Sequence, residues 1–155
     1  MKKIVLLGSG NEQINAIKIA NNLGYYVISL DSNPTAPGAK FSDSFFQCDI
    51  SSAKSVYEIV KNLKIDGIMV HAIELSNVVA EVSEKLGLPG ITREVAINAT
   101  NKLKRLEILK NNHIPCAEFG SAADINEAKN VAQDIGYPVV IKPVDNAGSR
   151  GVIQI

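Results

Sequence analysis

Short runs of β-branched and aliphatic residues alternate with amphipathic helical stretches through residues 3–88 of this chain. The first run covers residues 3–7, and the helical stretch after it ends at Gly24. A second run, residues 25–30, ends before Asp31. Strands and helices in alternation are typical of a parallel sheet with helices on both faces. We therefore predict an α/β fold with a Rossmann-like first domain.

Three helical stretches of this domain carry apolar residues at the spacing of one buried helix face. The second stretch starts behind Ser52, a residue type that caps helices, and leads into a strand at residues 67–70. The third ends at Gly87. The predicted buried positions of the three stretches are, in order, Ala16, Ile19, Ala20 and Leu23; Val56, Ile59, Val60 and Leu63; and Leu75, Val78, Val79, Val82 and Leu86.

The alternation of strands and helices stops after residue 90. Two helical stretches, residues 94–99 and 101–112, follow each other directly. This change of pattern indicates a second domain with a different architecture. We predict domains at residues 1–91 and 92–155.

The second predicted domain ends in a pair of strands. A short strand over residues 115–119 and a helix over residues 125–135 are predicted first. The apolar segments 137–143 and 152–155 then flank a turn-rich loop, which predicts an antiparallel hairpin. Two strands alone would leave an apolar face uncovered. We expect the remainder of this sheet to lie in a missing C-terminal region or a separate subunit.

Composition excludes several classes of protein. The chain carries 16 Lys and Arg against 16 Asp and Glu, and 46% of its 155 residues are hydrophobic. No basic tail or patch suits nucleic acid, and no apolar run suits a membrane span or a signal peptide. Cys48 and Cys116 lie far apart without other ligand residues at metal spacing, so no metal site is expected. These features favour a cytoplasmic globular protein that binds neither nucleic acid nor membranes.

Gly8, Ser9 and Gly10 form a loop between the first strand and the first helix. Glycines let the backbone turn sharply, and a helix N-terminus presents free N–H groups. Asp31 lies 21 residues after Gly10, where dinucleotide-binding folds keep an acid for a ribose hydroxyl, but Gln13 replaces the third glycine of that motif. A dinucleotide site, a structural turn and a small-substrate contact remain alternatives. The last is favoured because doubly wound sheets bind ligands at the carboxyl ends of their strands.

Lys142 ends an apolar run and is followed by a loop with glycine, serine and arginine. Backbone N–H groups, a hydroxyl and a guanidinium are donors that suit phosphate oxygens. The order strand, loop, strand differs from a P-loop. Taken alone, the segment is equally well explained as a solvated lysine beside an ordinary hairpin.

Five motifs in order along the whole chain give a resemblance to a known family. They are the Gly8-Ser9-Gly10 loop, Asp31–Gly38, Leu86–Gly90, Asn101-Lys102, and Gly136–Pro143 with the loop behind it. Together they resemble the ATP-grasp ligases. The carbamoyl-phosphate synthase large-chain-like, biotin carboxylase-like and phosphoribosylglycinamide formyltransferase-like members look most similar.

The resemblance implies a pre-ATP-grasp domain followed by the first part of an ATP-grasp domain. In similar proteins two lysines reach ATP phosphates, which implies Lys102 and Lys142, and a flexible loop covers the phosphates. That loop maps onto Asn146, Ala147, Gly148, Ser149, Arg150 and Gly151. The acceptor substrate is implied at Gly8, Ser9, Gly10, Asn11 and Glu12, with His71 and Glu74 in the segment where similar proteins usually carry Pro-Glu.

The implied reaction is activation of a carboxylate, or of bicarbonate, by ATP to an acyl phosphate that an amine or similar nucleophile attacks. Mg²⁺ is the implied metal, with its ligands outside this chain. The fragment is therefore expected to be inactive alone, and a homodimer is an arrangement that the sequence leaves open. The alternative is a free-standing Rossmann-like module that binds a nucleotide or metabolite without catalysis. An NAD-dependent oxidoreductase is disfavoured, because no acid–base residues accompany the first glycine loop.

Overall fold

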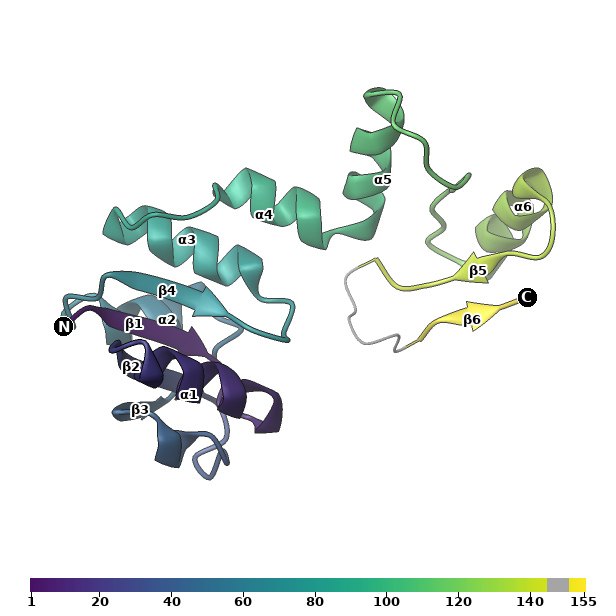
Figure 1. Ribbon diagram of the computed structural model, residues 1–155. Coiled ribbons are helices and arrows are strands. Elements are labelled where there is room, and N and C mark those ends of the chain that lie inside the picture. Colours follow the sequence, from purple (N-terminus) through teal and green to yellow (C-terminus); the bar gives the residue numbers. More distant parts are fainter. Residues whose placement is uncertain (145–150) are drawn as a thin grey trace. The chain divides into compact units, whose positions relative to one another are not determined.

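The computed structural model describes residues 1–144 and 151–155 (Figure 1). The chain divides into two compact units, Met1–Ala96 and Ile97–Ile155, and each is described by itself. The domain boundary near residue 91 stays a prediction from sequence.

A four-stranded parallel sheet forms the first unit, in the order β3-β2-β1-β4. Its strands are β1 (Lys3–Leu7), β2 (Tyr26–Asp31), β3 (Ser44–Gln47) and β4 (Gly67–Val70). The helices around it are η1 (Asn11–Gln13), α1 (Ile14–Asn22), η2 (Ala39–Phe41), α2 (Ala53–Val60) and α3 (Ser76–Leu86), and α4 (Arg93–Thr100) begins in this unit. The predicted α/β architecture is confirmed.

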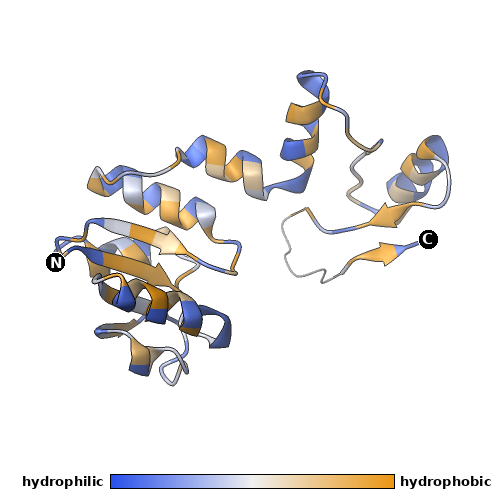
Figure 2. Cartoon of the chain, in the orientation of Figure 1, coloured by the Kyte–Doolittle hydropathy of each residue, from blue (hydrophilic) through white to orange (hydrophobic). Residues whose placement is uncertain are grey.

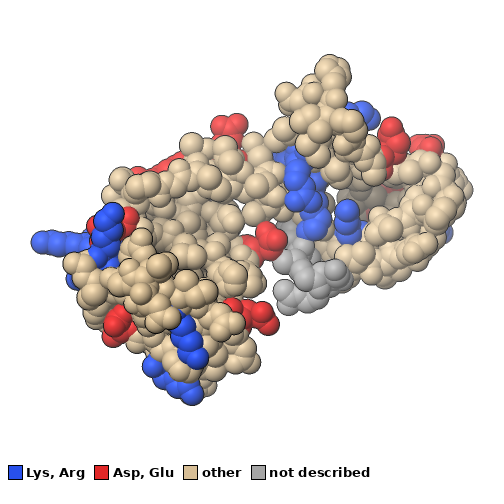
Figure 3. All heavy atoms as spheres, in the orientation of Figure 1, with Lys and Arg blue, Asp and Glu red and all other residues tan. Residues whose placement is uncertain are grey.

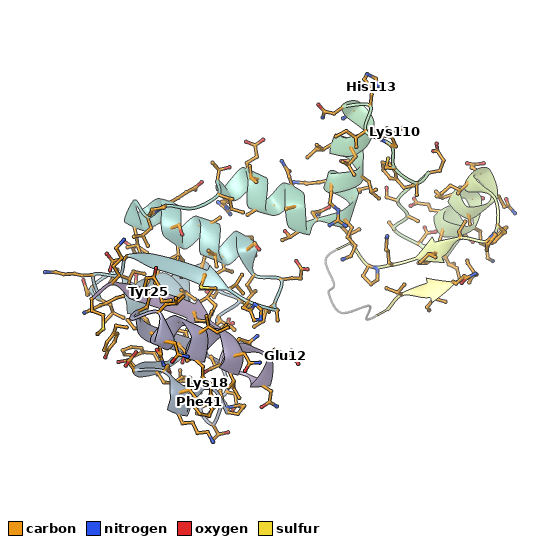
Figure 4. All side chains as sticks on the ribbon, viewed as in Figure 1. Glu12, Lys18, Tyr25, Phe41, Lys110 and His113 are labelled. Carbon is orange, nitrogen blue, oxygen red and sulfur yellow. The ribbon has the colours of Figure 1, made fainter. Side chains whose placement is uncertain are left out.

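Helices cover both faces of this sheet. Alternate strand residues point to opposite faces, so Val5 and Leu7 pack toward α2 and α3 whereas Leu6 packs toward α1 and η2. Apolar residues concentrate in the strands accordingly (Figure 2). On the second face the ammonium group of Lys18 lies 4.4 Å from the centre of the Phe41 ring, which adds a cation–π contact between α1 and η2 (Figure 4).

The helix-end signals read from the sequence are confirmed at α2 and α3. The hydroxyl of Ser52 accepts a hydrogen bond from the backbone N–H of Ser55 at 3.2 Å and so caps α2. Gly87 ends α3 in the left-handed conformation, with φ of 65°. These two helices also bury the predicted faces, with Val56 and Val82 fully enclosed.

The predicted buried face of α1 is confirmed for Ala16 and Ala20, which pack against the core, and wrong for Ile19 and Leu23. Ile19 and Leu23 are 59% and 70% exposed, whereas Ile17 is fully buried. The face that contacts the sheet carries Ile17 between two polar residues, Gln13 and Asn21, whose side chains bond to backbone carbonyl groups. Apolar spacing alone therefore placed Ala16 and Ala20 correctly but put Ile19 and Leu23 on a face that is centred on Ile17 instead. The sequence reading also missed β3, a four-residue strand.

The second unit holds two complete helices and a small antiparallel sheet. They are α5 (Lys102–Asn111), α6 (Ile125–Ile135), β5 (Val140–Ile141) and β6 (Ile153–Gln154). The pairing of β5 with β6 confirms the predicted hairpin. Reciprocal backbone hydrogen bonds between Val139 and Ile155 extend the pairing by one residue on each strand.

The strand predicted over residues 115–119 is wrong, because this segment has no regular secondary structure. No ladder partner lies beside it among the described residues, and an apolar run forms a strand only where it can pair. The strand predicted over 137–143 shrinks to β5 for the same reason. No helix in the described parts of the chain has the length and apolar character needed to cross a membrane.

Candidate functional site

All four strands of the first unit run parallel, so the loops that follow them meet at one edge of the sheet. The loop after β1 turns at Gly8, whose φ of 92° is a conformation that residues with a Cβ rarely adopt. The backbone N–H of Gly8 donates to the carbonyl of Leu30 at 2.7 Å and thereby joins this loop to β2. The predicted acceptor residues of this loop therefore lie at the carboxyl edge of the sheet.

Ser9 is fully buried within this loop. Its N–H donates to the Asp31 carboxylate at 2.7 Å, and its carbonyl accepts from the N–H of Gly38 at 2.7 Å. A Cβ on Gly38 would lie 2.7 Å from the same carbonyl oxygen, so the loop after β2 packs tightly on Ser9. The polar groups of Ser9 thus make hydrogen bonds within the fold.

Ser9 is the first of three buried or half-buried serines whose hydroxyls are hydrogen-bonded in series. The Ser9 hydroxyl donates to Ser29 at 3.2 Å, and the hydroxyls of Ser29 and Ser42 lie 2.7 Å apart. Ser42 donates in turn to the carbonyl of Ala39 at 2.8 Å. This serine chain connects the loop after β1 to η2.

Asp31 closes the turn after β2. One carboxylate oxygen accepts from the N–H of Ser9, and the other accepts from the N–H of Asn33 at 2.9 Å. Both carboxylate oxygens therefore accept hydrogen bonds from backbone N–H groups. A dinucleotide site instead needs this acid to bind a ribose hydroxyl. The arrangement disfavours the dinucleotide alternative.

Gln13 is a site residue that sequence reasoning missed, since it was interpreted only as a bulky substitute for glycine. Its side chain is 3% exposed. The amide oxygen accepts from the N–H of Gly10 at 3.0 Å, and the amide nitrogen donates to the carbonyl of His71 at 2.7 Å. The spacing of a helix-start residue followed three positions later by glutamine is a capping-box signal that could have found the first bond.

Four of the predicted acceptor residues are exposed at this edge, namely Asn11, Glu12, His71 and Glu74. Glu12 is the middle residue of η1, just before α1 (Figure 4). Figure 3 shows acidic side chains at the carboxyl ends of the strands. The loops after β1, β2 and β4 contain no lysine or arginine, so this edge favours a neutral or cationic group.

In the second unit, Lys102 begins α5 beside the segment that follows β5. Its backbone N–H and its ammonium group lie 3.1 and 3.4 Å from the carbonyl oxygen of Val144. Asn101 caps the helix by accepting from the N–H of Lys104 at 2.9 Å. Lys142 is exposed, two residues before Val144. The fold thus brings the start of α5 to the segment that contains Lys142, and Figure 3 shows basic side chains near the start of α5.

The predicted phosphate loop is described at one end. Asn146, Ala147, Gly148, Ser149 and Arg150 lie outside the described residues. Gly151 has φ of 73°, and a Cβ there would lie 3.0 Å from Pro143 Cγ. Glycine at this position therefore lets the returning chain pass close to Pro143.

No group of three or more His, Cys, Asp or Glu side chains is placed to hold a metal ion in the described parts of the chain. Cys48 and Cys116 are free thiols and half-buried. Burial, with smaller contributions from the negative charges of Asp49 and Asp31, raises the pKa of the Cys48 thiol to about 11. Cys48 is therefore a poor nucleophile and metal ligand near neutral pH.

Two protein-family models match the chain. Residues 1–96 match the ribonucleotide synthetase preATP-grasp domain. Residues 99–154 match the ATP binding domain of the carbamoyl-phosphate synthase L chain.

Individual relatives match nearly the whole length of this chain. The chain is 31% identical over 152 residues to formate-dependent phosphoribosylglycinamide formyltransferase from Prochlorococcus marinus (strain NATL2A), covering 97% of this chain and 39% of the relative. It is 28% identical over 170 residues to carbamoyl phosphate synthase large chain from Thermotoga petrophila, covering 97% of this chain and 15% of that protein. The chain therefore spans well under half the length of these relatives.

A solved structure agrees in fold across both units. N5-carboxyaminoimidazole synthetase from Staphylococcus aureus, complexed with ADP, superimposes with a TM-score of 0.83 at 20% sequence identity. The match covers 99% of this chain and 41% of that protein.

Proposed function

This chain belongs to the ATP-grasp superfamily, and from that premise we propose that it is the N-terminal part of an ATP-dependent ligase. The ligase activates a carboxylate, or bicarbonate, as an acyl phosphate, and an amine attacks that intermediate. Formate, the carboxylate in the name of one relative, is a compound of this class. The remainder of the ATP-grasp domain is supplied from outside residues 1–155.

The observation that carries this proposal is the contact between Lys102 and Val144. Hydrogen bonds from the N–H and the ammonium group of Lys102 hold the start of α5 against the segment that contains Lys142. Two lysines near one phosphate-binding segment supply positive charge where a triphosphate needs it. The ammonium groups bind and orient phosphate oxygens, and they neutralise charge that develops during phosphoryl transfer.

Among the described residues no group of three or more His, Cys, Asp or Glu side chains is placed to hold a metal ion, so the Mg²⁺ ligands of this proposal lie outside them. ATP supplies the phosphoryl group when it is bound. The residues of this chain bind and orient the phosphates, and catalysis requires the groups outside it.

The acceptor amine binds at the carboxyl edge of the first unit in this proposal. Glu12 and Glu74 are exposed there and can accept hydrogen bonds from an ammonium or amine group. The bonds that hold Gly8 and Ser9 to β2 and Asp31 keep the loop in one conformation. In a preformed site of this kind, less conformational entropy is lost when the ligand binds.

Titration of the chain with ATP and Mg²⁺, followed by NMR chemical shifts, tests the proposal, with NAD⁺ as a parallel ligand. Weak binding with shifts in the second unit is expected. Lys142→Ala and Lys102→Ala should each weaken it by about tenfold, because each removes a charge-assisted bond. Lys129→Ala, an exposed position on α6, is the matched control and should bind as wild type does. Equal affinity in Lys142→Ala contradicts the assignment, and tighter binding of NAD⁺ favours a binding module without ligase chemistry.

A further inference from the structure

Gln13 lies between the two loops that carry the proposed acceptor residues, and its role extends beyond helix capping. We propose that Gln13 is a positioning residue whose buried amide sets the spacing of these loops and thereby the affinity for the acceptor amine. This inference rests on the proposed function, because it takes the carboxyl edge of the first unit as the acceptor site. Gln13 itself, at 3% exposure, does not touch the acceptor.

Both polar groups of the Gln13 side chain are used in joining the loops. The oxygen accepts from the N–H of Gly10, and the nitrogen donates to the carbonyl of His71, at 3.0 and 2.7 Å. Gly10 precedes Asn11 and Glu12, and His71 opens the segment that ends at Glu74. One amide therefore links the backbone beside each set of exposed acceptor residues.

A second contact joins the same two loops. The Ile73 side chain packs on Gly8, where a Cβ would lie 2.5 Å from Ile73 Cδ1 and 3.3 Å from Gln13 Cδ. Ala72, between His71 and Ile73, has φ of 58°, a conformation that residues other than glycine rarely adopt. Such a conformation persists where neighbouring contacts fix it. The Gln13 bond and the Ile73 contact lie on either side of Ala72 and provide that support.

Two substitutions separate the shape of the side chain from its hydrogen bonds. Gln13→Met keeps the length and apolar volume but removes both bonds. Gln13→Glu keeps the shape and makes the donor depend on pH, because only the protonated carboxyl group can donate to the His71 carbonyl. Burial and the adjacent carbonyl favour the protonated form, so the bond should return as the pH falls.

The measurement is the affinity of glycinamide, used as a small amine probe, followed by chemical shifts at Gly10 and Glu74 in the full 155-residue chain. Gln13→Met should weaken binding about tenfold relative to wild type at both pH 5.5 and pH 8. Gln13→Glu should bind about tenfold more weakly at pH 8 and within twofold of wild type at pH 5.5. The titratable groups on the packed elements are Glu12, Asp31, His71 and Glu74. These groups titrate in wild type as well, so the ratio of the two affinities at each pH separates the effect of the substitution from theirs.

Hydrogen exchange of residues 71–75 provides a readout that does not depend on any ligand. Faster exchange in Gln13→Met than in wild type, with little change in β1 and β2, is expected if the amide couples the loops. Equal exchange and equal glycinamide affinity in wild type and Gln13→Met overturn the inference. Absence of glycinamide binding to wild type overturns the amine site on which it rests. Loss of ATP binding in Lys142→Ala supports the proposed function separately, so the two failures are distinguishable.

Discussion

Gly8 and Ile73 lie so close together that a Cβ on Gly8 would come within 2.5 Å of Ile73 Cδ1. The contact joins the loop after β1 to the loop after β4, at the edge where the proposed acceptor residues lie. The same glycine has φ of 92°. Its backbone conformation therefore disfavours a side chain, and a Cβ there would also have to displace the end of the Ile73 side chain.

Gly8→Ala should lower the free energy of unfolding by about 1–3 kcal/mol, since strain at positive φ is joined by the displacement of the Ile73 side chain. Urea unfolding followed by circular dichroism measures the change.

Gly24→Ala is the matched control for Gly8→Ala, because Gly24 has φ of 83° but no atom within 4 Å of an added Cβ. It should cost about 1 kcal/mol from strain alone. Equal losses in the two variants would show that the Ile73 contact contributes nothing. Ile73→Ala combined with Gly8→Ala should recover part of the loss by removing the clashing atoms.

Cys48 should react slowly with iodoacetamide. With a pKa of about 11 rather than the 9.0 of an unperturbed thiol, its thiolate fraction at pH 8 falls by about 100-fold. In a Cys116→Ser background, the rate at pH 8 should be lower by about that factor in the native chain than in urea, and it should still be rising above pH 10. Equal rates in the two states would contradict the burial of this thiol.

Ser52→Ala should destabilise the first unit by about 1 kcal/mol, because the N–H of Ser55 loses its hydrogen-bond acceptor. Ser52→Asp keeps an acceptor at the cap and should retain wild-type stability. Thermal unfolding of both variants measures the effect, and an unchanged midpoint in Ser52→Ala would argue against the cap.

The contribution of Glu81 to the free energy of unfolding should depend on pH. A hydrogen bond from Lys85, together with the positive charges of Lys85 and Arg93, lowers the pKa of the Glu81 carboxyl group. The stabilisation is therefore present at neutral pH and is lost as the pH falls through the lowered pKa of the folded state, where the carboxylate is protonated. Glu81→Gln should lower stability by under about 1 kcal/mol at pH 7 and by nothing measurable at pH 3. A difference that persists at pH 3 would contradict the ionic origin.

Much of the first unit could be predicted from sequence because its signals were local. Ser52 and Gly87 mark helix ends by their own chemistry, and β1 and β4 consist mainly of apolar residues. The face of α1 could be predicted only in part from apolar spacing. The contacting side carries Gln13 and Asn21, whose partners lie 58 and 20 residues away. Only the tertiary fold supplies those carbonyl groups.

In the candidate site, too, residue types could be recognised from the sequence, whereas contacts between distant segments could not be predicted. From the sequence, Asp31 was a candidate to bind a ribose hydroxyl. In the structure its carboxylate accepts hydrogen bonds from the backbone N–H groups of Ser9 and Asn33. Gln13 was interpreted as a departure from a glycine motif, whereas it bonds across to the loop after β4. The spacing of Lys102 and Lys142 gave no indication that Val144 would lie beside the start of α5. Each of these outcomes depends on a contact between distant segments.

The serine chain has a fixed direction. Ser42 donates to the Ala39 carbonyl, so its oxygen must accept from Ser29, and Ser29 must accept from Ser9. Each hydroxyl has a single hydrogen to donate, so removing Ser29 or Ser42 leaves the serine that donates to it without its acceptor in a largely buried part of the fold. The three positions are therefore energetically coupled, and the cost of a double replacement should fall below the sum of the single ones. In evolution, these serines are expected to be replaced together rather than one at a time.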